Sequence, residues 1–288
     1  MAIQTILTLL TGTTGTRAAI RLAAQIGRAV GAQVRALHVR AEPLKSLPMM
    51  GDPMAALSVP EVMRILTETA DARASQAREA FEAEIPESER ATTVAACRPG
   101  TYAVLWIEAR DDEGDVALRM ARLSDLIVLV RPLDGVGTVS SPTFESILFE
   151  SGRGVLVVPS AARQAKLGTV AVAWNGSVPA VHAVAAALPL LANADAVTVL
   201  TGTEGGYPDA TAEELVEYLA AHGVTARAKN FVADPDYSGR QLLELASEAG
   251  AELLVMGAYG HSRLREFTLG GATRDVLALA SLPVLMAH

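Results

Sequence analysis

Cysteine is almost absent from this sequence of 288 residues, which contains only Cys97. A single cysteine cannot form a disulfide within the chain, and it leaves no cysteine pair to hold a zinc ion. This usage is typical of proteins in a reducing compartment, so we expect a cytoplasmic protein. Cys97 ends the apolar run TTVAAC. Because free cysteines are usually buried, the run predicts a buried strand at this point.

Long hydrophobic runs are also missing. The longest candidate, AVAAALPLLANADAVTVL at 183–200, is interrupted by Pro189, Asn193 and Asp195. The opening stretch MAIQTILTLLTGT carries no basic residue, and its apolar part is too short for a signal peptide or a membrane span. We therefore expect no membrane association.

Positive charge and aromatic residues are scarce. Lysine and arginine number 24 against 32 acidic residues, the formal net charge is −8, and aromatic residues make up 4%. A nucleic-acid groove needs clustered basic residues, often with aromatic residues between them, so we expect no nucleic-acid partner. Half of the residues are apolar, and a chain of this length and composition predicts about two folded domains.

One pattern of strands and helices is present twice. ILTLLTGTTGTRAAIRLAAQIGRAV begins at Ile6 and corresponds to VAVAWNGSVPAVHAVAAALPLLANA, which begins at Val170, so that Gly12 matches Gly176. Two further pairs of runs correspond: SDLIVLV (124–130) with AELLVMG (251–257), and GVLVVP (154–159) with PVLMAH (283–288).

This alternation of short apolar strands with helices predicts an α/β fold in each half. Strands of this kind form a parallel sheet that helices cover on both faces, with right-handed crossovers. We place the first domain at 1–160 and the second at 166–288.

The segment 41–61, AEPLKSLPMMGDPMAALSVPE, is an insertion without a counterpart in the second half. Its four prolines and three methionines predict a loop. The loop is either an ordinary connector or an adaptable apolar surface that covers a site or binds a protein partner. The amphipathic stretch 61–85 predicts one long helix.

A glycine-rich loop, GAYGHSRLREFTLGGATRD, occupies 257–275. Gly257 follows a strand, where glycine lets a ligand approach the backbone. Gly270 and Gly271 stand at the start of the next helix, whose free N–H groups suit a phosphate. The corresponding helix of the first half begins SPTFESI, and Glu145 near its start would repel an anion. The loop is therefore either a phosphate site confined to the second half or a plain turn.

Gly257, Gly260 and Gly270 follow the spacing Gly, two residues, Gly, nine residues, Gly. This spacing, together with the strand and helix order of both halves, resembles the universal stress protein family. The resemblance implies two tandem open parallel sheets of five strands each, in the order 3-2-1-4-5, with helices on both faces. It also implies that the two domains pair through their last strands, GVLVVP and PVLMAH, and that a homodimer can form in addition.

The ATP-binding members of the family imply a site at the end of the first strand and in the glycine loop, with magnesium as a possible companion of ATP. The implied contacts to base and ribose are Ala173, Trp174, Asn175, Thr201 and Met256. The implied contacts to the phosphates are Gly257, Gly260, Gly270, Gly271, Ala272 and Thr273. Two positions depart from the family pattern: Asn175 replaces the usual aspartate, and Gly271 replaces a serine or threonine. Because one charge and one hydroxyl are lost, we expect weaker binding.

We therefore predict a stress-response regulatory protein that binds ATP in its second half and has a protein partner still to be identified. A nucleotide-free interaction module of the same fold is the alternative, and an enzyme of the related nucleotide α-hydrolase-like fold is a third reading. The histidines lack metal-ligand spacing, and no acid/base or nucleophilic set is visible, so at most slow ATP hydrolysis is expected. The acidic cluster DDEGD at 111–115 is either a cation site or an exposed helix start.

Overall fold

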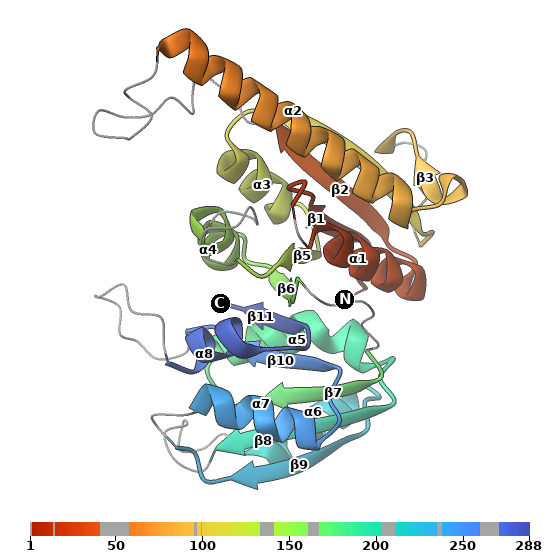
Figure 1. The fold of residues 1–288 in the computed structure, drawn as a ribbon. Helices are drawn as coiled ribbons and strands as arrows, with labels where there is room; N and C mark the ends of the chain where they lie inside the picture. Colours follow the sequence, from red (N-terminus) through yellow and green to blue (C-terminus); the bar gives the residue numbers. More distant parts are fainter. Residues whose placement is uncertain are drawn as a thin grey trace.

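The computed structural model describes residues 2–13, 15–40, 58–94, 97–98, 100–132, 141–160, 167–202, 211–234, 238–259 and 271–288. Most of the predicted insertion (41–57) and the glycine loop between 260 and 270 lie outside these segments. Figure 1 shows the two halves of the chain one beyond the other, with β6 and β11 where they meet.

The first half begins with β1 and ends with β6. Its elements are β1 (Thr5–Leu9), α1 (Thr16–Val30), β2 (Gln33–Arg40), α2 (Val59–Glu84), the 3-10 helix η2 (Glu87–Glu89), β3 (Arg90–Ala91), β4 (Ala103–Arg110), α3 (Glu113–Arg122), β5 (Leu126–Val130), α4 (Ser141–Glu150) and β6 (Gly154–Val158).

The second half repeats this order from β7 to β11. Its elements are β7 (Thr169–Ala173), α5 (Val178–Leu191), β8 (Ala196–Gly202), α6 (Ala212–Ala221), β9 (Ala226–Phe231), α7 (Ser238–Glu248), β10 (Leu253–Gly257), α8 (Gly271–Leu279) and β11 (Val284–Ala287). The repeat extends to backbone conformation, since Gly12 after β1 and Gly176 after β7 have φ angles of 70° and 72°.

All eleven strands of the described chain form one sheet, in the order β3-β4-β2-β1-β5-β6-β11-β10-β7-β8-β9. Within each half the five main strands have the expected order 3-2-1-4-5, and β3 adds a two-residue strand at one edge. The expectation of two separate sheets is wrong. β6 and β11 pair antiparallel, with Leu156 opposite Leu285, because each is the last strand of its half and would otherwise expose an unpaired edge.

Two hydrophobic cores lie on opposite faces of this sheet, and each runs through both halves. One contains residues of α1, α2, α5 and α6, and the other contains residues of α3, α4, α7 and α8. At the junction, Leu156 and Leu285 belong to the first core, whereas Val157 and Val284 belong to the second. Apolar burial on both faces therefore joins the two halves in addition to the strand pairing.

A carboxylate fixes the start of the first strand in each half. Asp125 Oδ2 accepts a hydrogen bond from the Thr5 N–H at 2.9 Å, and Glu252 Oε2 accepts one from the Thr169 N–H at 3.2 Å. Each carboxylate lies just before the fourth main strand of its half, so it ties that strand to the first one.

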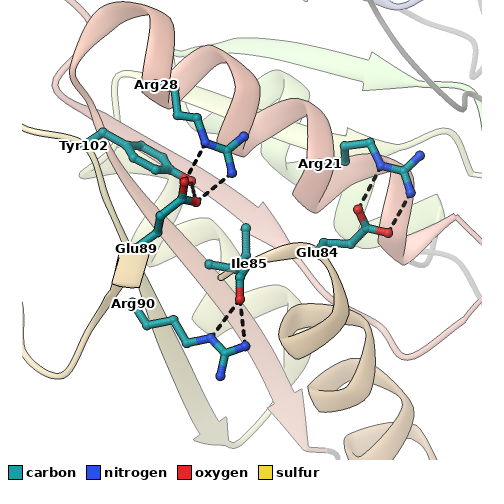
Figure 2. Close-up of polar contacts among 7 residues, drawn as sticks. All are labelled: Arg21, Arg28, Glu84, Ile85, Glu89, Arg90 and Tyr102. Atoms are coloured by element: carbon teal, nitrogen blue, oxygen red, sulfur yellow. Dashed lines mark hydrogen bonds and ion pairs between the residues drawn. The ribbon is translucent and has the colours of Figure 1, made fainter. Parts of the chain in front are cut away.

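Two arginines of α1 pair with carboxylates of α2 and of η2, the 3-10 helix that follows it (Figure 2). Arg21 bonds Glu84 through two nitrogens at 2.6 and 2.8 Å, and Arg28 bonds Glu89 at 2.6 and 3.1 Å. The Tyr102 hydroxyl donates to Glu89 at 3.1 Å. The hydrogen bond from Arg28 lowers the pKa of Glu89, while burial raises the pKa of Tyr102.

Three local expectations are settled by the structure. The helix predicted at 61–85 is confirmed as α2. The acidic cluster is a helix start, because Asp112 Oδ1 accepts a hydrogen bond from the Asp115 N–H at 3.1 Å and caps α3. The buried strand at Cys97 is wrong: Cys97 is partly exposed and outside any strand, and β4 instead pairs with the whole of β2.

In the described part of the chain, no helix combines the length and the apolar character that crossing a membrane requires.

Candidate functional site

Three parallel strands of the second half end side by side. Ala173 at the end of β7 pairs with Leu200 of β8 on one side and with Met256 of β10 on the other. β7 and β10 are the first and fourth strands of this half, between which the strand order reverses. Open α/β sheets bind ligands at such a point, beyond the carboxyl ends of the strands. We call this region the second-half edge; it contains Ala173, Trp174, Thr201, Met256 and Gly257.

Trp174 and Thr201 lie on the same face of the sheet at the second-half edge. The Trp174 N–H donates to the backbone oxygen of Leu200 at 2.9 Å, which keeps the two chains in register beyond β7. Trp174 packs against the core that contains Val199, and side chains alternate along a strand, so Thr201 faces the same way. Sequence reasoning named both residues but did not place them together.

Both side chains carry a buried polar atom without a partner. Neither the indole nitrogen of Trp174 nor the hydroxyl of Thr201 makes a hydrogen bond within the described part of the chain, and Thr201 is only 8% exposed. A buried polar group left in this state costs about 1–3 kcal/mol, and such groups are few in native structures. A ligand with polar atoms at this point would remove the cost.

Asn175 supports the turn that follows β7. Its Oδ1 accepts a hydrogen bond from the Ser177 N–H at 3.1 Å, and Ser177 Oγ in turn accepts one from the Ala180 N–H at 3.3 Å and caps α5. An aspartate oxygen could accept the same bond, so the turn does not need the charge. Asn175 keeps the shape of the turn, and its amide nitrogen is a donor that an aspartate would lack.

Gly257 is required for packing. A Cβ at this position would lie 2.5 Å from the backbone nitrogen of Ala180 and 2.8 Å from the carbonyl carbon of Pro179. The first turn of α5 therefore fills the space beside Gly257 that we had expected to be left for a ligand. Packing alone explains the glycine, and its contact with a phosphate stays a prediction.

The first turn of α8 presents backbone groups and one buried hydroxyl. Gly271 is exposed, and a Cβ there would meet no atom within 4 Å in the part of the chain that the structure describes. Ala272 is half-buried, while Thr273 is buried and its Oγ1 accepts a hydrogen bond from the Tyr259 N–H at 3.4 Å. This contact links the end of β10 to α8 across the glycine loop. Gly260 and Gly270 lie outside the described residues.

Helix α7 determines where α8 begins. A Cβ at Gly239 would lie 2.6 Å from the Ala272 carbonyl oxygen and 2.5 Å from the Asp275 Cβ. The backbone of α7 thus contacts the first turn of α8 directly. The sequence analysis missed Gly239, because a glycine near a helix start carries no local signal of what packs against it.

The corresponding edge of the first half is closed by α2. A Cβ at Gly12 would collide with the backbone carbonyl of Arg73 in the middle of α2. By strand register His38 takes the place of Thr201, and its Nδ1 hydrogen-bonds the Leu10 carbonyl oxygen at 2.7 Å while its ring stacks on Trp106. The absence of a phosphate site from the first half stays a prediction.

Among the described residues, no group of three or more histidine, cysteine or acidic side chains could hold a metal ion. His182 and His288 do lie close, since His182 Nδ1 is 3.0 Å from the backbone oxygen of His288. His261 lies outside the described residues.

The molecule is thus a tandem of two doubly wound α/β domains, and α2 covers the strand ends of the first at Gly12. Residues 166–288 match the family model described as the universal stress protein family. The second half is thus a domain of this family, and the first half repeats the same fold. No curated protein matches it by sequence.

Solved structures match the chain over almost its whole length. A universal stress protein from Archaeoglobus fulgidus DSM 4304 is 14% identical with a TM-score of 0.68, over 99% of this chain and 97% of that chain. A functionally unknown protein from Pseudomonas aeruginosa PAO1 is 14% identical with a TM-score of 0.55, over 99% and 92%. The cytoplasmic domain of a prokaryotic cation chloride cotransporter is 12% identical with a TM-score of 0.50, over 99% and 95%. At such identities these matches show the fold alone.

Proposed function

We propose that the second half binds an adenine nucleotide, ATP, at the second-half edge, and that the protein is a cytoplasmic stress-response regulator controlled by this ligand. The observation that carries the proposal is that the buried indole nitrogen of Trp174 and the buried hydroxyl of Thr201 have no hydrogen-bond partner among the described residues, at the point where the strand order reverses. The indole N–H can donate to a ring nitrogen or a ribose oxygen, and the threonine hydroxyl can donate or accept. The nucleoside part of ATP supplies both kinds of atom.

The phosphates would lie at the start of α8. The first N–H groups of a helix have no partner within it, and the helix dipole favours an anion there. A Cβ at Gly271 would meet no atom of the described residues within 4 Å. Gly260 and Gly270 remain sequence predictions for the same phosphates. Magnesium would enter with ATP and be bound mainly through phosphate oxygens.

Isothermal titration calorimetry with ATP and magnesium tests the proposal on the full chain. We expect one site, and we expect Thr201→Val to weaken binding by about five- to tenfold, which corresponds to roughly one hydrogen bond. Thr8→Val is the matched control, because Thr8 is also buried with an unpartnered hydroxyl but lies in β1 of the first half. The affinity of Thr8→Val for ATP should equal that of the wild type.

A second pair of variants tests the phosphate end. Gly271→Glu puts a negative charge at the start of α8 and should abolish binding. Leu279→Glu puts the same charge at the other end of α8, where Leu279 is 49% exposed, and should leave binding unchanged. If the wild type releases no heat up to millimolar ATP, the proposal is wrong. The alternative, a nucleotide-free interaction module, then becomes the hypothesis to test.

A homodimer, if one forms, needs a surface other than the last strands. β6 and β11 already pair with each other inside the chain, so neither offers a free edge to a second copy. The remaining strand edges are those of β3 and β9 at the two ends of the sheet.

A further inference from the structure

Helix α4 of the first half contacts Tyr259, near the start of the glycine loop of the second half. The ring of Phe149 lies 4.7 Å from the ring of Tyr259, centroid to centroid, and 4.9 Å from that of His288. The His288 Nδ1 is 3.1 Å from the backbone oxygen of Ala258. These contacts form a small aromatic cluster where the two halves meet, at the margin of the second core, against which Tyr259 packs.

Tyr259 has a backbone conformation that tyrosine rarely adopts. Its φ angle is 62°, and among the described residues it alone has a positive φ without being glycine. Such a residue persists where its surroundings hold it in place. Several contacts hold Tyr259. Its side chain packs on the ring of Phe149 and against the second core, and its ring centroid lies 6.4 Å from that of His288. Thr273 accepts a hydrogen bond from its N–H at 3.4 Å.

The charge near this tyrosine also comes from the first half. Burial, followed by the negative charge of Glu145 in α4, raises the pKa of Tyr259 to about 12. The phenol therefore stays neutral at physiological pH. Its ring can pack against Phe149 without the cost of burying a charge.

A second contact from the first half fixes the far end of α8. Arg131, which follows β5, donates a hydrogen bond through Nη1 to the Ala280 carbonyl oxygen at 2.8 Å. A cation is favourable at the carboxyl end of a helix. The first half thus contacts α8 at its end and, through Tyr259 and Thr273, at its beginning.

In both contacts, a side chain of the first half, Phe149 or Arg131, contacts the second half. The backbone bonds from Arg131 to Val158 and from Ala258 to Ala287 are equivalent in the two halves. By this equivalence the second half has Ala258 in place of Arg131, and the first half has Pro132 in place of Tyr259. Ala258 cannot repeat the hydrogen bond that Arg131 donates, and Pro132 cannot repeat the ring contact of Tyr259. The second half therefore does not contact the first in the same two ways.

We infer that the first half is a positioning partner for the nucleotide site of the second half, with Phe149 as the positioning residue that acts through Tyr259 on the first turn of α8. The inference rests on the proposed function for its ligand. By thermodynamic reciprocity, a nucleotide bound at the second-half edge must then stabilise the contact of α4 with Tyr259. The first half would thereby sense the ligand without binding it.

Hydrogen–deuterium exchange of the full chain tests the positioning without any ligand. Phe149→Ala should speed exchange several-fold in peptides covering 253–259 and 271–279, while the urea midpoint changes little, because Phe149 is 39% exposed. Phe149→Tyr should restore the wild-type rates, since a ring can still pack on Tyr259. Leu123→Ala, also in the first half and 69% exposed, is the control and should exchange like the wild type.

Titration with ATP and magnesium then tests the coupling. Phe149→Ala should bind about five- to tenfold more weakly than the wild type, and ATP should slow exchange in α4 of the wild type but not of that variant. Unchanged exchange in 271–279 of Phe149→Ala overturns the inference whether or not ATP binds. If Phe149→Ala exchanges faster there but the wild type binds no ATP, the positioning is upheld and the nucleotide function is refuted.

Discussion

Replacing Leu285 with alanine tests whether the two halves unfold as one cooperative unit. Leu285 is fully buried in β11, lies opposite Leu156 of β6 and belongs to the core that runs along one face of the whole sheet. The substitution removes apolar contacts on the second-half side of the junction. If the shared sheet and core couple the halves, the first half must lose stability as well.

The expected cost is large because the site cannot collapse. Leucine-to-alanine substitutions in buried cores cost about 2–5 kcal/mol, and the higher values apply where the backbone is held on several sides. Strands β6 and β10 flank Leu285, so we expect about 3 kcal/mol. With a urea dependence of about 3 kcal/mol per molar for a chain of this size, the unfolding midpoint should fall by about 1 M.

The two tryptophans make the assay specific for each half. The chain has two tryptophans, of which Trp106 lies in β4 of the first half and Trp174 follows β7 of the second. Variants with Trp106→Phe or Trp174→Phe leave one fluorescent reporter each. In both backgrounds Leu285→Ala should lower the urea midpoint by the same amount, whereas Leu279→Ala, at an exposed site, should change it little.

A split result would refute this reasoning. If the Trp174 midpoint falls while the Trp106 midpoint stays in place, the junction between β6 and β11 transmits no stability. The two halves would then be independent domains that happen to share a sheet.

Two smaller predictions concern stability. Because the hydrogen bond from Arg28 lowers the pKa of Glu89, the stability that this carboxylate adds is present above about pH 4.5 and is lost as the pH falls through its lower folded pKa. The difference in unfolding free energy between the wild type and Glu89→Gln should therefore shrink from pH 6 to pH 3 in urea titrations, and a constant difference would contradict it. Gly257→Ala should lower the thermal midpoint by several degrees, because its Cβ would lie 2.5 Å from the backbone nitrogen of Ala180. Gly271→Ala is the control, because no described residue lies close to a Cβ at that position. Equal midpoints for the two variants would show that α5 shifts to make room for the added methyl group.

Much of each half could be predicted from local pattern. Periodicity and turn residues located the helices and strands, and the helix expected at 61–85 differs from α2 by two residues at its start and one at its end. The failure at Cys97 shows the limit of this approach. The run TTVAAC has the composition of a strand, but β2 pairs with 103–110 instead, and a strand forms where it finds a partner.

The candidate site, too, could be predicted only in part from the sequence. The sequence singled out Trp174, Thr201 and Thr273 through a resemblance, and Gly257 through its place after a strand. It could not show that Trp174 and Thr201 lie on the same face of the sheet, or that their indole nitrogen and hydroxyl have no hydrogen-bond partner among the described residues, since they come from different strands. Nor could it show that α5 already fills the space beside Gly257.

By itself, the sequence determined that two α/β units follow one another and that a glycine loop distinguishes the second. Hydrophobic period and turn chemistry act over a few residues, so they can be read along the chain. Only the tertiary structure decided that the units share one sheet, that α2 closes the first edge, and that Phe149 packs on Tyr259. The shared sheet depends on the antiparallel pairing of β6 with β11, and all three outcomes depend on contacts between segments that are far apart in the sequence, which no local pattern encodes.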